Sequence, residues 1–309
     1  MSAAIAVIGV ASLYASVGVR AFPLEYAAST APEWMGISVS GAATHVARIQ
    51  RALGDDVRLC CPVGRDLAGT LIRAELDRLG LVGPGTVDVP VSSTGLVLAD
   101  TDGRRMGMPH LDPVDGFPYP FDVLRGQACA ADLLVLTNAR FVRPLVGRAA
   151  GLGVPIAVDV HRIAGLGDDY DRPWLEHAEI VFGSHERMGD PRTWIAEMFA
   201  RRRQIRLLGV GMGARGAVLG LRDGRLIEVR TVARRGPVNT SGAGDALFAT
   251  FLSVLLRTGD PVTALRSGVV HASWKIAHRL PVEATLDAGD LDEMQRASAA
   301  PTAVTRWDR

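Results

Sequence analysis

The stretch Asn239-Thr240-Ser241-Gly242-Ala243-Gly244-Asp245 runs directly into an apolar helical pattern that begins at Ala246 and continues to Leu255. Glycine is about 1 kcal/mol less favourable than alanine inside a helix, so two glycines at a helix start need a specific cause. The first N–H groups of a helix are unpaired and carry partial positive charge. Because Gly242 and Gly244 lack a Cβ atom, a phosphate can approach this backbone closely. The stretch therefore predicts an anion site at a helix N-terminus.

Asp245 lies in the first turn of the same predicted helix. A carboxylate there can accept the proton of a hydroxyl that attacks a phosphoryl group held by the helix end. The alternative is that Ser241 caps an ordinary helix and that Asp245 only compensates the helix dipole. The stretch alone leaves both interpretations open.

Composition limits the function classes. The chain has 309 residues, of which 48% are hydrophobic and 22% charged, enough for one large α/β domain with a sizeable core. The net charge of +1 provides no field that would attract nucleic acid or a membrane, so neither is predicted as a partner. The apolar N-terminal stretch lacks a basic segment and predicts a buried strand rather than a signal peptide. Cys60, Cys61 and Cys129 match neither a metal site nor a disulfide framework, which predicts reduced, buried thiols in a cytoplasmic protein.

Strand-like runs alternate with helical patterns along the chain, which predicts a parallel sheet covered by helices on both faces. The predicted strands include residues 133–136, 156–160, 180–182 and 205–208, and the predicted helices include residues 41–53 and 69–79. Asp102-Gly103 and Asp223-Gly224 each separate two apolar runs and predict hairpins. We expect a single domain over residues 1–309. Within it, residues from about 15–38 and 90–110 would form a small β-lid that excludes water from the substrate.

Residues Gly211-Met212-Gly213-Ala214-Arg215-Gly216 match the pattern G-x-G-x-x-G. A dinucleotide-binding fingerprint requires a helix after the glycines, whereas an apolar strand, 217–221, and a hairpin turn follow here. The motif therefore predicts a glycine-rich turn between two strands. That turn either lies beside a nucleotide or is a plain connection.

Four segments together resemble the PfkB/ribokinase-like carbohydrate kinase family across nearly the whole chain. Residues Ser40-Gly41-Ala42-Ala43-Thr44-His45 are similar to its N-terminal Gly-Gly motif, and 63–69 to its G-x-D-x-x-G segment. The turn 211–216 is similar to the T-L-G-x-x-G turn, and 240–245 matches the C-terminal T-x-G-A-G-D signature. The resemblance implies a three-layer α/β/α sandwich with a mostly parallel sheet.

The resemblance also implies transfer of the γ-phosphoryl group of ATP to a hydroxyl of a sugar or sugar derivative. Asp245 would be the base, and the backbone N–H groups of Gly242, Ala243 and Gly244 would stabilise the transferred group. Mg²⁺ would bridge the donor phosphates. Lid strands of such kinases can pair between subunits, which would give a homodimer.

Other positions are assigned by the same resemblance. The substrate would contact Ser12, Tyr14, Ser40, Gly41, His45 and Asp245, and the nucleotide would contact Gly211, Gly213, Gly216, Ser184 and His271. A core position is the alternative for His271. Glu186 is the candidate for organising Mg²⁺, because Arg187 stands where the family has the Glu of N-x-x-E.

Departures from the family pattern concern the substrate and the cations. Tyr14 replaces the Asp of the segment G-x-x-N-x-D, and His45 replaces an Asn, so a nucleoside is an alternative acceptor. Packing is the alternative role for Tyr14. Asn239 replaces an Asp that often helps to hold a monovalent cation, which leaves a potassium requirement open. The alternative to an enzyme is a catalytically silent protein that senses a sugar or nucleoside. The retained Asp245 argues against a sensor, because a protein that only binds its ligand does not need the base.

Overall fold

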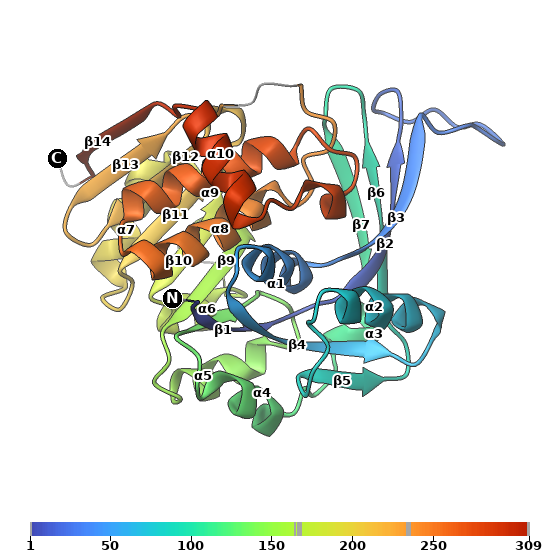
Figure 1. The fold of residues 1–309 in the computed structure, drawn as a ribbon, viewed down its shortest axis with the longest axis horizontal. Coiled ribbons are helices and arrows are strands. Elements are labelled where there is room, and N and C mark those ends of the chain that lie inside the picture. The colour runs from blue at the N-terminus through green and yellow to red at the C-terminus, as the bar shows by residue number, and fades with distance from the viewer. Residues whose placement is uncertain (1, 164, 166–168, 233–235, 308–309) are drawn as a thin grey trace.

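The computed structural model describes residues 2–163, 165, 169–232 and 236–307. In this described part, a ten-stranded sheet forms the body of the molecule and a separate four-stranded sheet stands at one end (Figure 1). The order in the large sheet is β14 (Thr302–Arg306), β13 (Arg225–Val229), β12 (Ala217–Leu221), β11 (Leu207–Gly211), β10 (Ile180–Ser184), β9 (Ile156–Arg162), β8 (Leu133–Leu136), β1 (Ala4–Ile8), β4 (Asp56–Gly64) and β5 (Thr86–Val89). Neighbours from β11 to β5 are parallel, and β11 to β14 pair in antiparallel fashion.

Helices cover both faces of this sheet. One face carries α1 (Ala42–Ala52), α2 (Leu67–Arg78), α8 (Ala243–Thr258), α9 (Pro261–Lys275) and α10 (Ala288–Ala297). The other carries α3 (Asp112–Asp115), α4 (Phe121–Ala128), α5 (Val146–Ala150), α6 (Arg172–His177) and α7 (Pro191–Arg201). Short 3-10 helices are η1 (Arg143–Leu145), η2 (His185–Arg187), η3 (Gly213–Arg215) and η4 (Pro281–Ala284). The predicted α/β/α sandwich is confirmed.

Strand β1 explains why the sheet needs helices on both sides. Its side chains alternate between the two faces, with Ile5 and Val7 in one core cluster and Ala6 and Ile8 in the other. All four side chains are fully buried. A parallel strand that is apolar on both faces is stable only between two helical layers.

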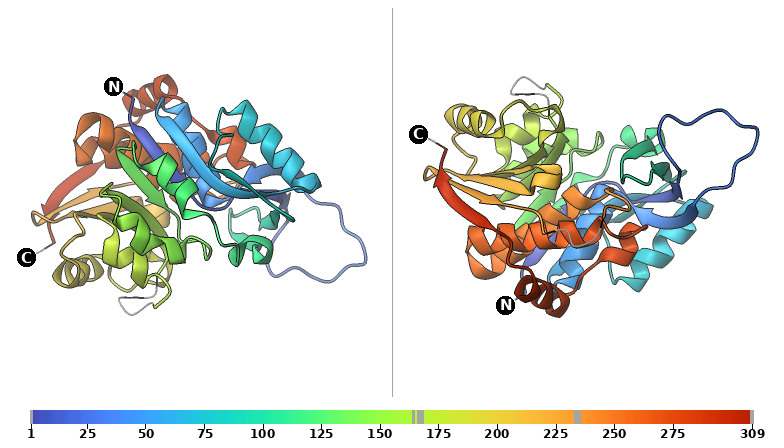
Figure 2. Two further views of the ribbon diagram at one scale, coloured as in Figure 1. Left: turned by 90° about the horizontal axis from the view of Figure 1, so that it is seen from below. Right: turned by 90° about the horizontal axis from the view of Figure 1, so that it is seen from above.

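The four-stranded sheet has the order β3 (Trp34–Ser40), β2 (Ser12–Gly18), β6 (Ser93–Ala99) and β7 (Arg105–His110). It lies at the end of the molecule opposite β14 (Figure 1). The connection between β2 and β3 projects from the body in both views of Figure 2. Strands β6 and β7 fall within the predicted lid segment 90–110, whereas β2 and β3 overlap the predicted segment 15–38 and extend beyond it to Ser12 and Ser40. The lid function itself stays a prediction.

Local predictions were confirmed where a turn signal and an apolar run coincide. Both Asp-Gly hairpins form, with Gly103 and Gly224 at positive φ. The predicted strand over 205–208 begins two residues later, at Leu207, and the apolar Ile205 is buried in the loop that precedes β11. Cys60 and Cys61 are buried free thiols, whereas the expectation of a buried Cys129 was wrong, since Cys129 is exposed just after α4. No helix in the described ranges is long and apolar enough to cross a membrane.

Candidate functional site

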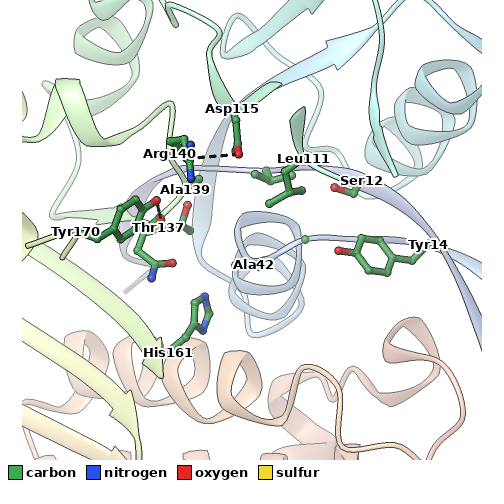
Figure 3. Close-up of a pocket in the computed structure, with 13 residues that line it drawn as sticks. Ser12, Tyr14, Ala42, Leu111, Asp115, Thr137, Ala139, Arg140, His161 and Tyr170 are labelled. Atoms are coloured by element: carbon green, nitrogen blue, oxygen red, sulfur yellow. Dashed lines mark hydrogen bonds and ion pairs between the residues drawn. The ribbon is translucent and has the colours of Figure 1, made fainter. Parts of the chain in front are cut away.

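The carboxyl ends of β1, β8 and β9 meet at one edge of the parallel sheet and form a pocket there. The pocket has a volume of about 310 Å³ and is lined by Val10, Ser12, Tyr14, Gly41, Ala42, Leu111, Asp115, Thr137, Asn138, Ala139, Arg140, His161 and Tyr170 (Figure 3). An open surface hollow of about 480 Å³ on α9 and α10 contains none of the predicted site residues. The pocket at the strand ends is therefore the candidate substrate site.

Most of the residues that line the pocket have polar side chains. Asp115 and Arg140 form an ion pair at 3.7 Å, and the Tyr170 hydroxyl donates a hydrogen bond of 2.7 Å to the Asn138 carbonyl oxygen. Figure 3 shows the rings of Tyr14 and Tyr170 on opposite sides of the pocket. Carboxylate, guanidinium and amide groups of this kind bind hydroxyl-rich molecules by hydrogen bonds.

Ser12 and Tyr14 lie in the pocket wall where the resemblance placed them. The buried Ser12 hydroxyl lies 2.6 Å from the Ser93 hydroxyl, so it joins β2 to β6. The Tyr14 ring packs over Gly95, where any Cβ atom would overlap it. Burial raises the pKa of Tyr14, so its hydroxyl stays neutral and can donate a hydrogen bond. Tyr14 thus combines the packing role with a place at the pocket.

His161 lines the pocket and contacts Asp159, whose carboxylate lies beside the predicted anion site at Gly244. Its φ of 54° makes it the one non-glycine residue with positive φ in the described part of the chain, and it lies where the β9–β10 register is interrupted. Its backbone N–H donates a hydrogen bond of 2.8 Å to Asp159 Oδ1. Side chains rarely adopt this backbone conformation without a local cause, and strained residues cluster at functional sites.

The predicted anion site lies at the start of α8. Gly242 is the N-cap, with φ 76° and ψ 7°, so the cap is Gly242 and not Ser241. A Cβ atom on Gly244 would lie 3.7 Å from Asp159 Oδ2, which places a carboxylate from the end of β9 beside the helix start. The buried Ser241 hydroxyl has no hydrogen-bond partner among the described residues. The N–H groups of Gly242 and Gly244 have no hydrogen-bond partner among the described residues, whereas the Ala243 N–H donates a bond of 3.3 Å to the Thr240 carbonyl oxygen. The turn therefore offers two free backbone N–H groups and one unpaired hydroxyl.

The Asp245 carboxyl group lies against this turn. A Cβ atom on Gly242 would lie 3.7 Å from Asp245 Oδ2. The side chain keeps partial exposure, yet the protein atoms around the carboxyl group remove enough water to raise its pKa to about 6. Positive charge on His161, Arg105 and Lys275 opposes this rise, and Asp159 adds to it. Asp245 thus has the pKa of a group that exchanges protons near neutral pH.

A second group of predicted residues lies at the ends of β10 and β11. Ser184 pairs with Gly211 in the parallel register. The Gly211–Gly216 motif forms the turn between β11 and β12, as predicted, with Gly213 and Gly216 at positive φ. His185, which the sequence did not single out, lies 3.0 Å from the Gly211 carbonyl oxygen through Nδ1. Glu186 is exposed and lies 3.8 Å from Arg162.

Two predicted histidines are held by hydrogen bonds inside the protein. His271 is fully buried, with Nδ1 2.7 Å from the Thr250 hydroxyl and Nε2 3.1 Å from the Ala284 carbonyl oxygen, so the structure favours the core interpretation over contact with adenine. His45 Nε2 lies 2.8 Å from the Ser40 hydroxyl. Burial, with Arg48 and Lys275, lowers the pKa of His45 to about 3, so this ring is neutral. His45 borders Gly242 and does not line the pocket.

Comparison with known proteins shows which families this chain is similar to. Residues 175–287 match the model of the pfkB family carbohydrate kinases. An ATP-dependent ribose-1-phosphate kinase of Halopiger xanaduensis is 28% identical over 237 residues, which are 74% of this chain and 77% of that protein. A microbiome-derived acarbose kinase superposes with a TM-score of 0.83 at 22% identity, covering 96% of this chain and all of that one. A Burkholderia thailandensis nucleoside kinase in complex with inosine gives 0.76 at 20% identity, with 95% and 98% coverage.

Proposed function

Because the chain belongs to the pfkB family of carbohydrate kinases, we propose that it transfers the γ-phosphoryl group of ATP to a hydroxyl of a sugar or sugar derivative. The observation that carries this proposal is the placement of Asp245. Its carboxyl group lies against a left-handed glycine turn at a helix start, and His161 connects that turn to a polar pocket. A base, an anion site and a hydroxyl-binding pocket thus adjoin one another, as phosphoryl transfer requires.

In the proposed reaction, the oxygen of the acceptor hydroxyl attacks the γ-phosphorus, and Asp245 accepts the hydroxyl proton. The bond between the γ-phosphorus and the β,γ-bridging oxygen breaks, and ADP leaves with that oxygen. The N–H groups of Gly242, Ala243 and Gly244 donate hydrogen bonds to the oxygens of the transferred group. Mg²⁺ bound to the ATP phosphates supplies charge neutralisation and needs only one or two protein carboxylates. Asp159, the carboxylate beside Gly244, would be one of these, and Glu186 stays the candidate from the sequence.

The nucleotide would lie along the ends of β10 and β11. Gly211, Gly213 and Gly216 leave this turn free of side chains, and Ser184 and His185 border it. Closure of the four-stranded sheet over the pocket would exclude water and protect ATP from hydrolysis. A homodimer through an edge of that sheet and a cytoplasmic location also stay predictions.

A nucleoside is the second candidate acceptor. The observation that favours it is the pair of rings, Tyr14 and Tyr170, that border the pocket (Figure 3), because aromatic faces can stack on a base. His45 does not add to this argument, since Ser40 holds its ring outside the pocket lining.

A panel of acceptors tests the proposed function. We expect ADP release from Mg·ATP with one class among free sugars, sugar phosphates, sugar acids, polyols and nucleosides, and loss of that release in Asp245→Asn. Turnover of nucleosides alone would select the second candidate. Thermal stabilisation by these ligands without turnover across the panel would contradict a kinase and support a sensor.

The pH dependence of the reaction provides a separate prediction. Burial raises the pKa of Asp245 to about 6, and the base must be deprotonated to act. We therefore expect kcat/KM to be level above pH 7 and to fall about tenfold per pH unit well below pH 6. The measurement is kcat/KM for the acceptor from pH 4.5 to 9 at saturating Mg·ATP. A profile that stays level to pH 5 would mean that no carboxyl group with a raised pKa limits the reaction.

A further inference from the structure

Lys275 is the only lysine in a sequence whose other cationic side chains are all arginines. It is the last residue of α9 and is 2% exposed. Its Nζ atom donates a hydrogen bond of 3.3 Å to the Asn239 carbonyl oxygen, and no ion pair in the described ranges includes it. Burying an ammonium group without a paired carboxylate costs folding free energy, which indicates that Lys275 is buried for a functional reason.

The Lys275 side chain lies directly beneath the anion site. A Cβ atom on Gly242 would lie 3.4 Å from Lys275 Cε. The charged groups that face it are Asp245 from α8, Glu283 from η4 and Arg105 from β7, with the neutral His45 on α1. Burial and Arg105 lower the pKa of Lys275 to about 8, so the ammonium form predominates at pH 7. A positive charge is thereby fixed behind the turn that would receive the phosphoryl group.

A monovalent cation, which the sequence leaves open, does not fit the residues around Asn239. The Asn239 Oδ1 atom accepts a hydrogen bond of 2.9 Å from the Ser241 N–H. The Asn239 Nδ2 atom donates a hydrogen bond of 2.8 Å to the Arg279 carbonyl oxygen. The Asn239 carbonyl oxygen accepts a hydrogen bond from Lys275 Nζ. Three oxygens that could ligate a cation thus already accept hydrogen bonds, and the side chain at 239 carries no charge.

We propose that Lys275 is a positioning residue whose ammonium group holds the Asn239–Gly242 turn and supplies internally the charge of a bound monovalent cation, so that the enzyme needs no potassium. This inference rests on the proposed function for its effect on catalysis. Lysine suits the role because its ammonium is a compact charge on a flexible chain, whereas the planar guanidinium of arginine is larger and requires a wider set of acceptors.

The catalytic test compares the wild-type protein with Lys275→Met, which keeps the length and apolar body of the side chain. We expect the wild-type rate to change less than twofold when potassium replaces choline. In Lys275→Met, kcat should fall about 10- to 100-fold with little change in the acceptor KM, since a charge near the transferred group is lost. Ammonium or potassium ions should restore part of that rate. The exposed Arg51→Met serves as the control for loss of a cation and should keep full activity.

A second readout does not need turnover. Lysine labelled with ¹³C at Cε gives one side-chain signal in the untagged protein, because the sequence contains one lysine. We expect Mg·ATP to shift this signal and potassium to leave both the signal and the Tm of the wild-type protein unchanged. Strong activation of the wild-type protein by potassium, or full kcat in folded Lys275→Met, would overturn the inference. Failure to turn over any acceptor would contradict the proposed function. A rise in the Tm of the wild-type protein with potassium would overturn this inference whether or not an acceptor is turned over.

Discussion

Replacing Asp245 with asparagine is expected to lower kcat by about 10²- to 10⁴-fold, because the proton of the acceptor hydroxyl then has no carboxylate to receive it. Asparagine has nearly the same shape, so binding of Mg·ATP and the acceptor should change little. The measurement is kcat and KM for both substrates at pH 8. Full activity in the variant would remove Asp245 from the mechanism.

The same substitution is expected to stabilise the fold. Burial raises the pKa of Asp245 to about 6, above its value in the unfolded chain, so ionisation of this carboxyl group disfavours the folded state. The cost is fully present above the folded pKa and absent below the unfolded pKa. Asp245→Asn should therefore raise the Tm at pH 8 and lose this advantage towards pH 4. Asp77→Asn makes the same chemical change on the exposed side of α2 and should leave the Tm unchanged at both pH values.

Sequence patterns predicted the elements of this fold wherever the signal is local. The Asp-Gly turns, the apolar runs and the glycine-rich helix start each depend on a few neighbouring residues, and all of them form. The exposure of Cys129 could not be predicted, because it depends on where α4 ends relative to the body of the protein. Resemblance to a family added the order of the motifs but not the contacts between them.

The residues of the candidate site were likewise predictable only where they lie close together in the sequence. Asp245 and its glycines lie in one segment, so the sequence predicted them together. Asn138, His161 and Tyr170 lie on separate segments that only the ends of parallel strands bring to one pocket. One signal for Lys275 was present, because a single lysine among arginines is unusual, but its burial beneath Gly242 requires the α8–α9 packing. His271 matched a family position, and its burial together with its hydrogen bonds to Thr250 and Ala284 favours a core role.

Gly41→Ala is expected to cause the largest loss of stability among single substitutions at the pocket. Gly41 is the N-cap of α1 and has φ 105° and ψ 144°, a conformation that side chains rarely adopt. A Cβ atom there would also overlap the Val10 carbonyl oxygen, which belongs to the chain between β1 and β2. The left-handed backbone costs about 1 to 2 kcal/mol, and displacing packed backbone adds about 1 to 3 kcal/mol.

Gly54→Ala is the matched control for this prediction. Gly54 also has positive φ, at 94°, but nothing lies within 4 Å of a Cβ atom there. Urea unfolding should therefore show a loss of about 1 to 2 kcal/mol for Gly54→Ala and about twice that or more for Gly41→Ala. Since Gly41 lines the pocket beside Val10, its variant should also lose kcat/KM, whereas Gly54→Ala should keep it. Equal losses of stability in the two variants would mean that backbone conformation alone, and not the contact with Val10, makes glycine necessary at position 41.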